Sequence, residues 1–211
     1  MERIFAIGDI HGCFDKLQAL MSVVDIHPSK DTLVFLGDYI DRGPSSHEVV
    51  EYLITLKKRF EKLVFLKGNH EEMLLNYLQG INRLAYLANG GQQTIDSYIK
   101  AGRSPSTGLI PQNHLDFFNS LDLFYQTDNY VFVHAGLVDK IPVEQQHVED
   151  ILWIRNRFIK SAYDFGRQVV FGHTPLPEPL VQSNKIGIDT GAVYGNKLTC
   201  VLLPALTFYQ A

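Results

Sequence analysis

Side chains that can bind metal ions follow apolar runs at five places in the chain. Each run predicts a buried strand, and the polar residues come where that strand ends. In residues 37–43, for example, Asp38 follows the apolar residues 32–36. The residues found at such strand ends are Asp9, His11, Asp38, Asn69, His134 and His173. These oxygen and nitrogen ligands, with no thiolate among them, suit divalent manganese, iron or zinc.

The spacing of the first three motifs predicts that these side chains share one site. Asp9, Asp38 and Asn69 follow one another at intervals of roughly 30 residues, the length of one βαβ unit. Successive strands of a parallel sheet end side by side at one edge, where the sites of layered α/β folds form. We therefore expect the metal-binding side chains to converge there.

Two cations fit this set of ligands better than one. Asp9 and His11, two residues apart, can bind one cation, and Asp38 can bridge it to a second. The other ligands of the second cation would be Asn69, His134 and His173. Two cations about 3.5–4 Å apart with a bridging hydroxide supply a nucleophile for in-line attack on phosphorus.

Phosphoryl transfer also needs the phosphate oxygens to be held and the leaving group to be protonated. Arg42 follows the metal motif closely, and its planar guanidinium can bind two phosphate oxygens. His70 comes directly after a predicted ligand, and with Asp41 beside it would form a carboxylate–imidazole pair that protonates the departing oxygen. Arg155, in a predicted helical segment at 149–163, is the candidate for a second phosphate clamp.

The elements that must position these side chains begin with alternating strands and helices. Apolar spacing predicts strands at 3–7, 32–36 and 62–66 and helices at 14–24, 44–60 and 71–78. This order predicts parallel strands with right-handed crossovers. Later strands are predicted at 130–133, 168–171, 185–188, 198–203 and 206–209. We expect two stacked sheets with helices outside, in a single domain that spans residues 1–211.

Residues 80–128 differ in character from the rest of the chain. They contain breaks at 89–91 and 102–106 and short helix-like runs at 94–101 and 112–121. We interpret this section as a helical insert that caps the active site.

Composition excludes several classes of protein. The chain has 211 residues, 45% of them hydrophobic, and a formal net charge of −4, so it shows no basic footprint for nucleic acid or membranes. The first strand leaves no room for a signal peptide, and no apolar run approaches the roughly 18 residues of a membrane span. Cys13 and Cys200 are expected to be reduced, partly buried thiols. We expect a cytoplasmic protein, monomeric by default.

Five motifs carry a resemblance to a known family, at residues 8–12, 37–43, 68–71, 134–136 and 172–174. They resemble the signature motifs of the PPP-type metallophosphatases, and residues 89–91 and 153–155 resemble the small bacterial and phage branch of that family. The resemblance implies an α/β fold, the calcineurin-like metallophosphoesterase αββα sandwich of two mixed β-sheets flanked by helices. It also implies two divalent metal ions, with manganese as the first expectation and iron or zinc as alternatives.

The same resemblance implies an activity and a role for each site residue. The activity is that of a protein serine/threonine phosphatase, often also active on tyrosine, whose partners are phosphorylated proteins or peptides. One metal would be held by Asp9, His11 and Asp38, and the other by Asp38, Asn69, His134 and His173. Phosphate would be bound by Arg42, Asn69 and Arg155, and acid catalysis would rest on His70 with Asp41.

Two other functions compete with this one. A related family that hydrolyses dinucleoside polyphosphates, such as diadenosine tetraphosphate, shares the opening pattern of residues 8–13. That family tends to lack the carboxylate corresponding to Asp41 and to end its third motif in Asp, so Asp41 and Glu71 favour the phosphatase. A catalytically inactive binding scaffold should have lost a ligand or His70, and none is missing.

Several further residues are expected outside the catalytic machinery. Glu71 is expected to be a first-turn acid of a helix rather than a ligand, and Trp153 is expected in the core. Surface or loop positions are expected for His27, His47, His114 and His147. Support of the site by Asp189 and a place for Tyr194 in the pocket are left open.

Overall fold

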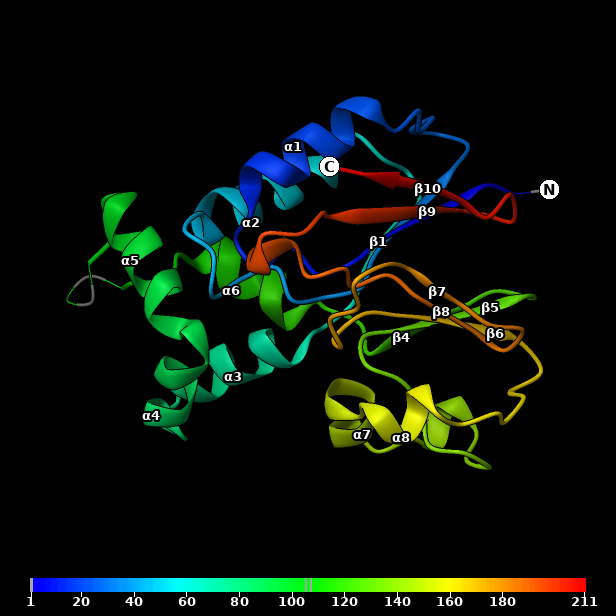
Figure 1. Ribbon diagram of the computed structural model, residues 1–211. Coiled ribbons are helices and arrows are strands. Elements are labelled where there is room, and N and C mark those ends of the chain that lie inside the picture. The colour runs from blue at the N-terminus through cyan, green and yellow to red at the C-terminus, as the bar shows by residue number, and fades with distance from the viewer. Residues whose placement is uncertain (1, 105, 107) are drawn as a thin grey trace.

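The strands form two mixed sheets that pack face to face (Figure 1). The computed structural model describes residues 2–104, 106 and 108–211. Within them the first sheet consists of β10 (Thr207–Gln210), β9 (Thr199–Leu203), β1 (Ile4–Ile7), β2 (Thr32–Phe35) and β3 (Leu63–Phe65), in that spatial order. The second consists of β4 (Phe124–Gln126), β5 (Tyr130–Val133), β6 (Gln168–Phe171), β8 (Lys185–Gly187) and β7 (Leu180–Val181). The expected sandwich of two mixed sheets is confirmed.

Alternation along the strands divides the core into layers. In β1, Ile4 and Ala6 face the second sheet and pack in one cluster with Val170 of β6. Phe5 and Ile7 point the opposite way and pack against helices. Side chains of successive strand residues point to opposite faces, so one short strand supplies two layers of the core at once.

Helices cover both outer faces of the sandwich (Figure 1). The first sheet packs with α1 (Phe14–Val23), α2 (Ser46–Leu56), α3 (Asn69–Leu78), α5 (Gln92–Lys100) and α6 (Gln112–Asn119). The second sheet is covered by α7 (Val148–Trp153) and α8 (Asn156–Ile159). Parallel pairing of β1 with β2 and of β2 with β3 agrees with the predicted order of strands and helices.

The helix predicted at 44–60 is shorter in the structure, at Ser46–Leu56, and the predicted elements differ from the structure in four further places. The helical segment predicted at 149–163 is divided between α7 and α8, because Arg155 has non-helical angles (φ −128°, ψ −112°). The helix after the third strand begins two residues early, so Asn69 and His70 lie in the first turn of α3. The short strands β4 and β7 were not predicted.

The fourth difference lies in residues 80–128. A short helix α4 (Arg83–Tyr86) continues through a π-helical turn at Leu87–Gly91 into α5. Gly90 has a φ of 99° there, and its carbonyl accepts a hydrogen bond from the backbone N–H of Arg42 over 3.0 Å. A Cβ at this position would lie 2.6 Å from the Arg42 side chain, so only glycine allows this approach. The predicted break at 89–91 is a helical kink.

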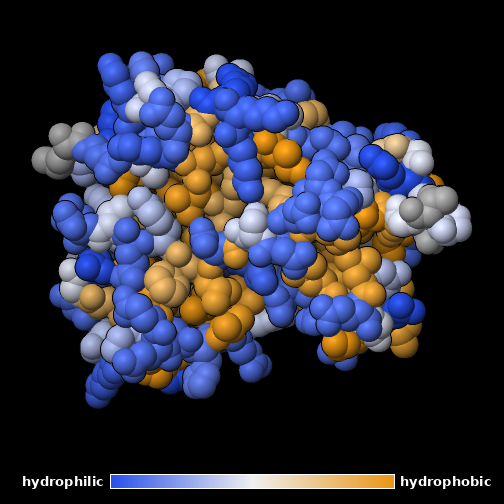
Figure 2. Space-filling model, turned by 180° about the vertical axis from the view of Figure 1, so that it is seen from behind, coloured by the Kyte–Doolittle hydropathy of each residue, from blue (hydrophilic) through white to orange (hydrophobic). Residues whose placement is uncertain are grey.

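The outer surface mixes polar and apolar side chains. On the face shown in Figure 2, apolar side chains reach the surface in several areas with hydrophilic ones between them. No helix in the described part of the chain is long and apolar enough to cross a membrane.

Candidate active site

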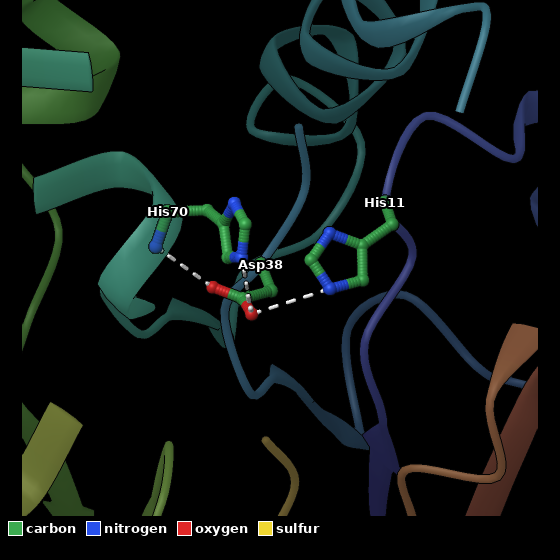
Figure 3. Close-up of side chains that lie close together, drawn as sticks. All are labelled: His11, Asp38 and His70. Atoms are coloured by element: carbon green, nitrogen blue, oxygen red, sulfur yellow. Dashed lines mark hydrogen bonds and ion pairs between the residues drawn. The ribbon is translucent and has the colours of Figure 1, made fainter. Parts of the chain in front are cut away.

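Asp38 lies at the centre of the site, just beyond β2, and its two oxygens face different histidines. Oδ2 is 3.3 Å from Nε2 of His11 (Figure 3), and Oδ1 is 3.5 Å from Nε2 of His134. The backbone N–H of His70 donates to Oδ1 over 3.1 Å. All four residues are buried. A carboxylate with one oxygen toward each of two imidazoles is well placed to bridge two cations.

Backbone carbonyls determine the tautomers of two of these histidines. Nδ1 of His11 lies 2.8 Å from the carbonyl oxygen of Ile40, and Nδ1 of His134 lies 2.8 Å from that of Leu36. A carbonyl only accepts hydrogen bonds, so each Nδ1 carries the proton and each Nε2 offers a lone pair to the site. Hydrogen bonds of this kind orient metal-binding histidines.

The surroundings of His134 fit a cation better than a hydrogen-bond network. Its Nε2, which carries a lone pair, lies 3.0 Å from Oδ1 of Asn69 and 3.2 Å from Nδ1 of His173. The amide oxygen of Asn69 is also an acceptor, so no proton joins it to Nε2. Two acceptors at this distance repel each other unless a cation lies between them. The donor set therefore fits a metal ion.

Burial and neighbouring charge determine which forms these groups take. Burial lowers the pKa of His11 to about 3 and that of His173 to about 2, and it also lowers the pKa of His134. Burial alone would raise the pKa of Asp38. That pKa nevertheless lies well below its usual value, because in acid the surrounding histidines, His134 first, become protonated and their charge favours the carboxylate. Neutral imidazoles around an ionised carboxylate are the forms that bind cations.

Asp9 lies beside this centre rather than among its closest atoms. Its carboxylate accepts the backbone N–H of His173, at 3.1 and 3.0 Å for the two oxygens. Burial, and then the charges of Asp189 and Asp38, raise the pKa of Asp9 well above its usual value. The closest groups of ligand atoms are His11 with Asp38 and His70, and Asp38 with His134 and His173. Asp189 is buried near Asp9, and its carboxylate accepts the backbone N–H of Gly191 over 2.9 Å.

Both arginines that were predicted to bind phosphate contact predicted metal ligands. Nη1 of Arg42 donates to Nε2 of His11 over 2.6 Å, and Nη1 of Arg155 donates to the carbonyl oxygen of His173 over 3.1 Å. The guanidinium of Arg42 therefore faces the lone pair on Nε2 of His11, which a cation would bind. Two guanidinium groups at the rim suit an anionic ligand.

His70 and Asp41 form the predicted carboxylate–imidazole pair. Nδ1 of His70 lies 2.7 Å from Oδ2 of Asp41, and both side chains are fully buried. The other oxygen of Asp41 accepts the hydroxyls of Tyr86 and Thr94, over 2.8 and 2.6 Å. Nε2 of His70 is buried and has no hydrogen-bond partner among the described residues. That nitrogen is left available for a ligand.

Tyr86 and Thr94 were not identified from the sequence. Both belong to residues 80–128 and lie more than forty positions after Asp41. No motif marks them, because a single Tyr or Thr in a helix has many other uses. The one sequence feature that points to this section is the glycine-containing break at 89–91, where the chain comes close to Arg42.

The loops of the site hold strained backbone. Positive φ angles occur at His11, Asp38, Asp41, Arg42 and His173. Each costs roughly 1–3 kcal/mol and persists where the surroundings enforce it. Glu71 helps to hold the loop after β2 in this conformation. Its carboxylate accepts the backbone N–H groups of Asp38, Tyr39 and Gly68 over 2.9–3.0 Å. Glu71 is thus a first-turn acid of α3, as expected.

Three other residues complete the comparison with the sequence. The prediction for His114 was wrong, because α6 packs on α2 and buries the side chain completely. The prediction for Trp153 was also wrong. It ends α7 with 41% of its surface exposed, and its ring centre is 6.1 Å from that of His173. Tyr194 is 63% exposed, and its ring centre is 5.7 Å from the guanidinium carbon of Arg42.

Two surface pockets lie beside the site, one at each exposed aromatic ring. The first, of about 370 Å³, is lined by Trp153, Tyr86 and Asn89 among others. The second, of about 490 Å³, is lined by Tyr194, Arg42 and Asn89 among others. Asn89 borders both, so the pockets adjoin. Trp153 and Tyr194 thus each border a pocket next to the site, and Arg42 lines the second one.

Known proteins resemble this chain over nearly its full length. A model of the calcineurin-like phosphoesterase family matches residues 2–202. A protein of Anoxybacillus flavithermus named as the asymmetrical bis(5'-nucleosyl)-tetraphosphatase PrpE is 30% identical, over 95% of this chain and 90% of its own length. A protein of the same name from Bacillus mycoides is 31% identical, with the same two coverages.

Solved structures show the same fold. One described as a candidate diadenosine tetraphosphatase has a TM-score of 0.77 and 25% identity, and covers 100% of this chain and 93% of its own. A cold-active protein-tyrosine phosphatase of a Shewanella species has a TM-score of 0.74 at 16% identity, over 100% of this chain and 80% of its own. The chain therefore belongs to the calcineurin-like phosphoesterase family and is a metallophosphoesterase, a hydrolase.

Proposed function

We propose that this protein hydrolyses dinucleoside tetraphosphates asymmetrically, to a nucleoside monophosphate and a nucleoside triphosphate. The observation that carries the proposal is the likeness, over 95% of the chain, to proteins named for that activity. This reverses the preference based on Asp41 and Glu71, which favoured a protein phosphatase. Glu71 holds the loop and Asp41 holds the ring of His70 with either substrate, so the presence of these two residues does not exclude a dinucleotide.

The geometry of the site supports a substrate with two bases. Exposed aromatic rings stack on nucleobases, with a contribution of about 1–3 kcal/mol per base. Trp153 and Tyr194 stand at the two pockets, and the metal centre and both arginines lie close to them. One base would stack on each ring, with the polyphosphate across the centre.

The residues of the centre take the roles that their contacts allow. Two divalent ions, manganese or else iron or zinc, would supply Lewis acidity and a nucleophile, held by Asp9, His11, Asp38, Asn69, His134 and His173. Arg42, Asn69 and Arg155 would hold the phosphate oxygens. Nε2 of His70 would donate a proton to the leaving oxygen, while Asp41 orients the ring and stabilises its charged form.

Dephosphorylation of phosphoproteins or phosphopeptides is the second candidate. The buried pair of His70 and Asp41 favours it, because a serine or threonine alkoxide needs a proton to leave. In the hydrolysis of a dinucleoside polyphosphate, by contrast, the leaving group is a phosphate anion, which departs readily without a proton. A complete acid pair therefore fits an ester substrate at least as well as an anhydride.

The aromatic rings provide the test of the first candidate. Trp153→Leu and Tyr194→Leu should each raise KM for diadenosine tetraphosphate about tenfold, which corresponds to the loss of about 1.4 kcal/mol of stacking. Turnover of a small aliphatic phosphate monoester, followed by phosphate release, should stay unchanged, because that substrate has no ring to stack. Steady-state kinetics on both substrates measures this.

Tyr163→Leu is the matched control, since Tyr163 is 36% exposed and lies after α8, outside both pockets. An equal loss on the monoester, or no change on the dinucleotide, would contradict base stacking at these rings.

A further inference from the structure

A second group of metal-binding side chains lies outside the active site. His47 and Glu51 are one turn apart on α2, and His114 faces them from α6. Nε2 of His114 is 2.9 Å from Oε1 of Glu51, and Nε2 of His47 is 3.9 Å from the same oxygen. The three ligand atoms all lie within 4.8 Å of one another.

The distances between these three ligand atoms are close to those found around a small cation. Ligand bonds of about 2.0–2.1 Å in a tetrahedral zinc site place neighbouring ligand atoms roughly 3.4 Å apart. Glu51 therefore needs to move slightly away from His114 and slightly toward His47. Side-chain rotation supplies both shifts, since 43% of the Glu51 side chain is exposed.

The ring of His114 is in a form that can bind a cation. Burial lowers the pKa of His114, which keeps the ring neutral at physiological pH. Its Nδ1 lies 2.7 Å from the hydroxyl oxygen of Tyr98. Without a cation, Nε2 carries the proton and donates it to Glu51 over 2.9 Å, and Nδ1 accepts the Tyr98 hydroxyl. A cation at Nε2 would move the proton to Nδ1, where the Tyr98 oxygen can accept it. The ring of His47 lies beside that of His114, with 5.3 Å between centres and 36° between planes.

We propose that His47, Glu51 and His114 bind a third divalent cation, of the zinc type. Two imidazole nitrogens and one carboxylate oxygen are a ligand set that zinc takes when it keeps a position for water. The partly exposed Glu51 and His47 give the ion access from solvent, and the buried His114 anchors it.

The cation would fasten residues 80–128 to the body of the protein. It would join α2 to α6, and through Tyr98 to α5. Ser46, which precedes His47, hydrogen-bonds both the backbone N–H of Asp41 and the hydroxyl of Thr94. A clamp at this position would thus hold the helices beside the loop that carries Asp41.

A hydrogen bond between His114 and Glu51 explains part of the same geometry without a metal. Glu51→Gln separates the two explanations, because the glutamine oxygen still accepts the imidazole proton but no longer offers a negative ligand. His47→Ala removes a ligand that takes no part in that hydrogen bond. His147→Ala is the matched control, since His147 is exposed and lies at the start of α7.

The test counts zinc in the full-length protein. Wild type and the three variants are stripped with chelator, reloaded with Zn²⁺, freed of excess ion by gel filtration and measured by mass spectrometry of the metal. His47→Ala and Glu51→Gln should each carry one equivalent of zinc less per chain than wild type and His147→Ala. The midpoint of thermal unfolding should also rise less on zinc addition in these two variants, with an unchanged midpoint in chelator for Glu51→Gln.

Equal zinc content in all four proteins would overturn the proposal, as would a loss shared by His147→Ala. A variant with a lowered midpoint in chelator but full zinc content would also overturn it, since that result assigns the cluster to hydrogen bonding alone.

Discussion

Among the contacts of single residues, the one between His134 and Asn69 gives the clearest support for a cation at the centre. Leu36 fixes the tautomer of His134, so that a nitrogen lone pair faces an amide oxygen at 3.0 Å. Both residues were predicted as ligands from their places after strands. The tautomer could not be predicted, because the carbonyl that fixes it belongs to Leu36, which follows β2 and lies 98 residues earlier in the chain.

His70 should matter to a degree that depends on the leaving group. In His70→Asn, hydrolysis of a phosphoserine peptide should fall about 10²–10⁴-fold, the usual contribution of general acid catalysis. Hydrolysis of diadenosine tetraphosphate should fall less, because its leaving group departs as a stabilised anion. Turnover numbers on the two substrates, with bound metal counted, measure the difference. Equal losses on both substrates would contradict a role limited to protonating the leaving group.

Residues 80–128 contact the site through two hydroxyl groups and supply none of the predicted metal ligands. Tyr86 from α4 and Thr94 from α5 both donate to Asp41, and Gly90 between them accepts the backbone N–H of Arg42. We propose that this section is the cap of the active site. Its separate character was visible in the sequence, but its contacts were not, since the π-helical turn at Leu87–Gly91 decides which side chains face Asp41.

Removing the Thr94 hydroxyl should disturb the site without touching a ligand. Thr94 donates to Oδ1 of Asp41 and accepts its backbone N–H, so Thr94→Val leaves two buried groups without this partner. The free energy of unfolding should fall by about 1–3 kcal/mol, and kcat should fall about tenfold as the carboxylate loses its alignment. Denaturant unfolding and steady-state kinetics measure the two effects.

Thr55→Val serves as the control for that change, because Thr55 is exposed and its hydroxyl donates only to a neighbouring carbonyl in α2. If Thr94→Val lowers stability yet leaves kcat untouched, the section supports the fold and does not cap the site.

At the scale of the whole molecule, most of the fold follows from strand alternation. The segments predicted as strands at 3–7, 32–36, 130–133 and 168–171 all form β-strands, and their residues divide between the layers as period two requires. The edge strands β4 and β7 escaped prediction because none of their residues is buried, so they lack the buried apolar run that marks the equally short β8.

Removal of the metal ions should destabilise the entire domain. Buried Asp9, Asp38 and Asp189 lie close enough that their charges interact, and bound cations would offset that repulsion. Two ions, each at one hundred times its Kd, add about 5 kcal/mol to the free energy of unfolding. The midpoint of thermal unfolding should therefore drop by roughly 10–20 °C in chelator. Calorimetry with and without manganese measures it, and an unchanged midpoint would argue against metals at this centre.

The most direct test of the account is a comparison of substrates by metal-stripped protein with and without added manganese. The substrates are diadenosine tetraphosphate, a phosphoserine peptide, a phosphotyrosine peptide and a chromogenic phosphate monoester, and chromatography identifies the products. We predict manganese-dependent hydrolysis with the highest kcat/KM on diadenosine tetraphosphate, giving AMP and ATP in equal amounts. Two molecules of ADP would contradict the asymmetric cleavage, and a higher kcat/KM on the phosphopeptides would make the protein a phosphoprotein phosphatase.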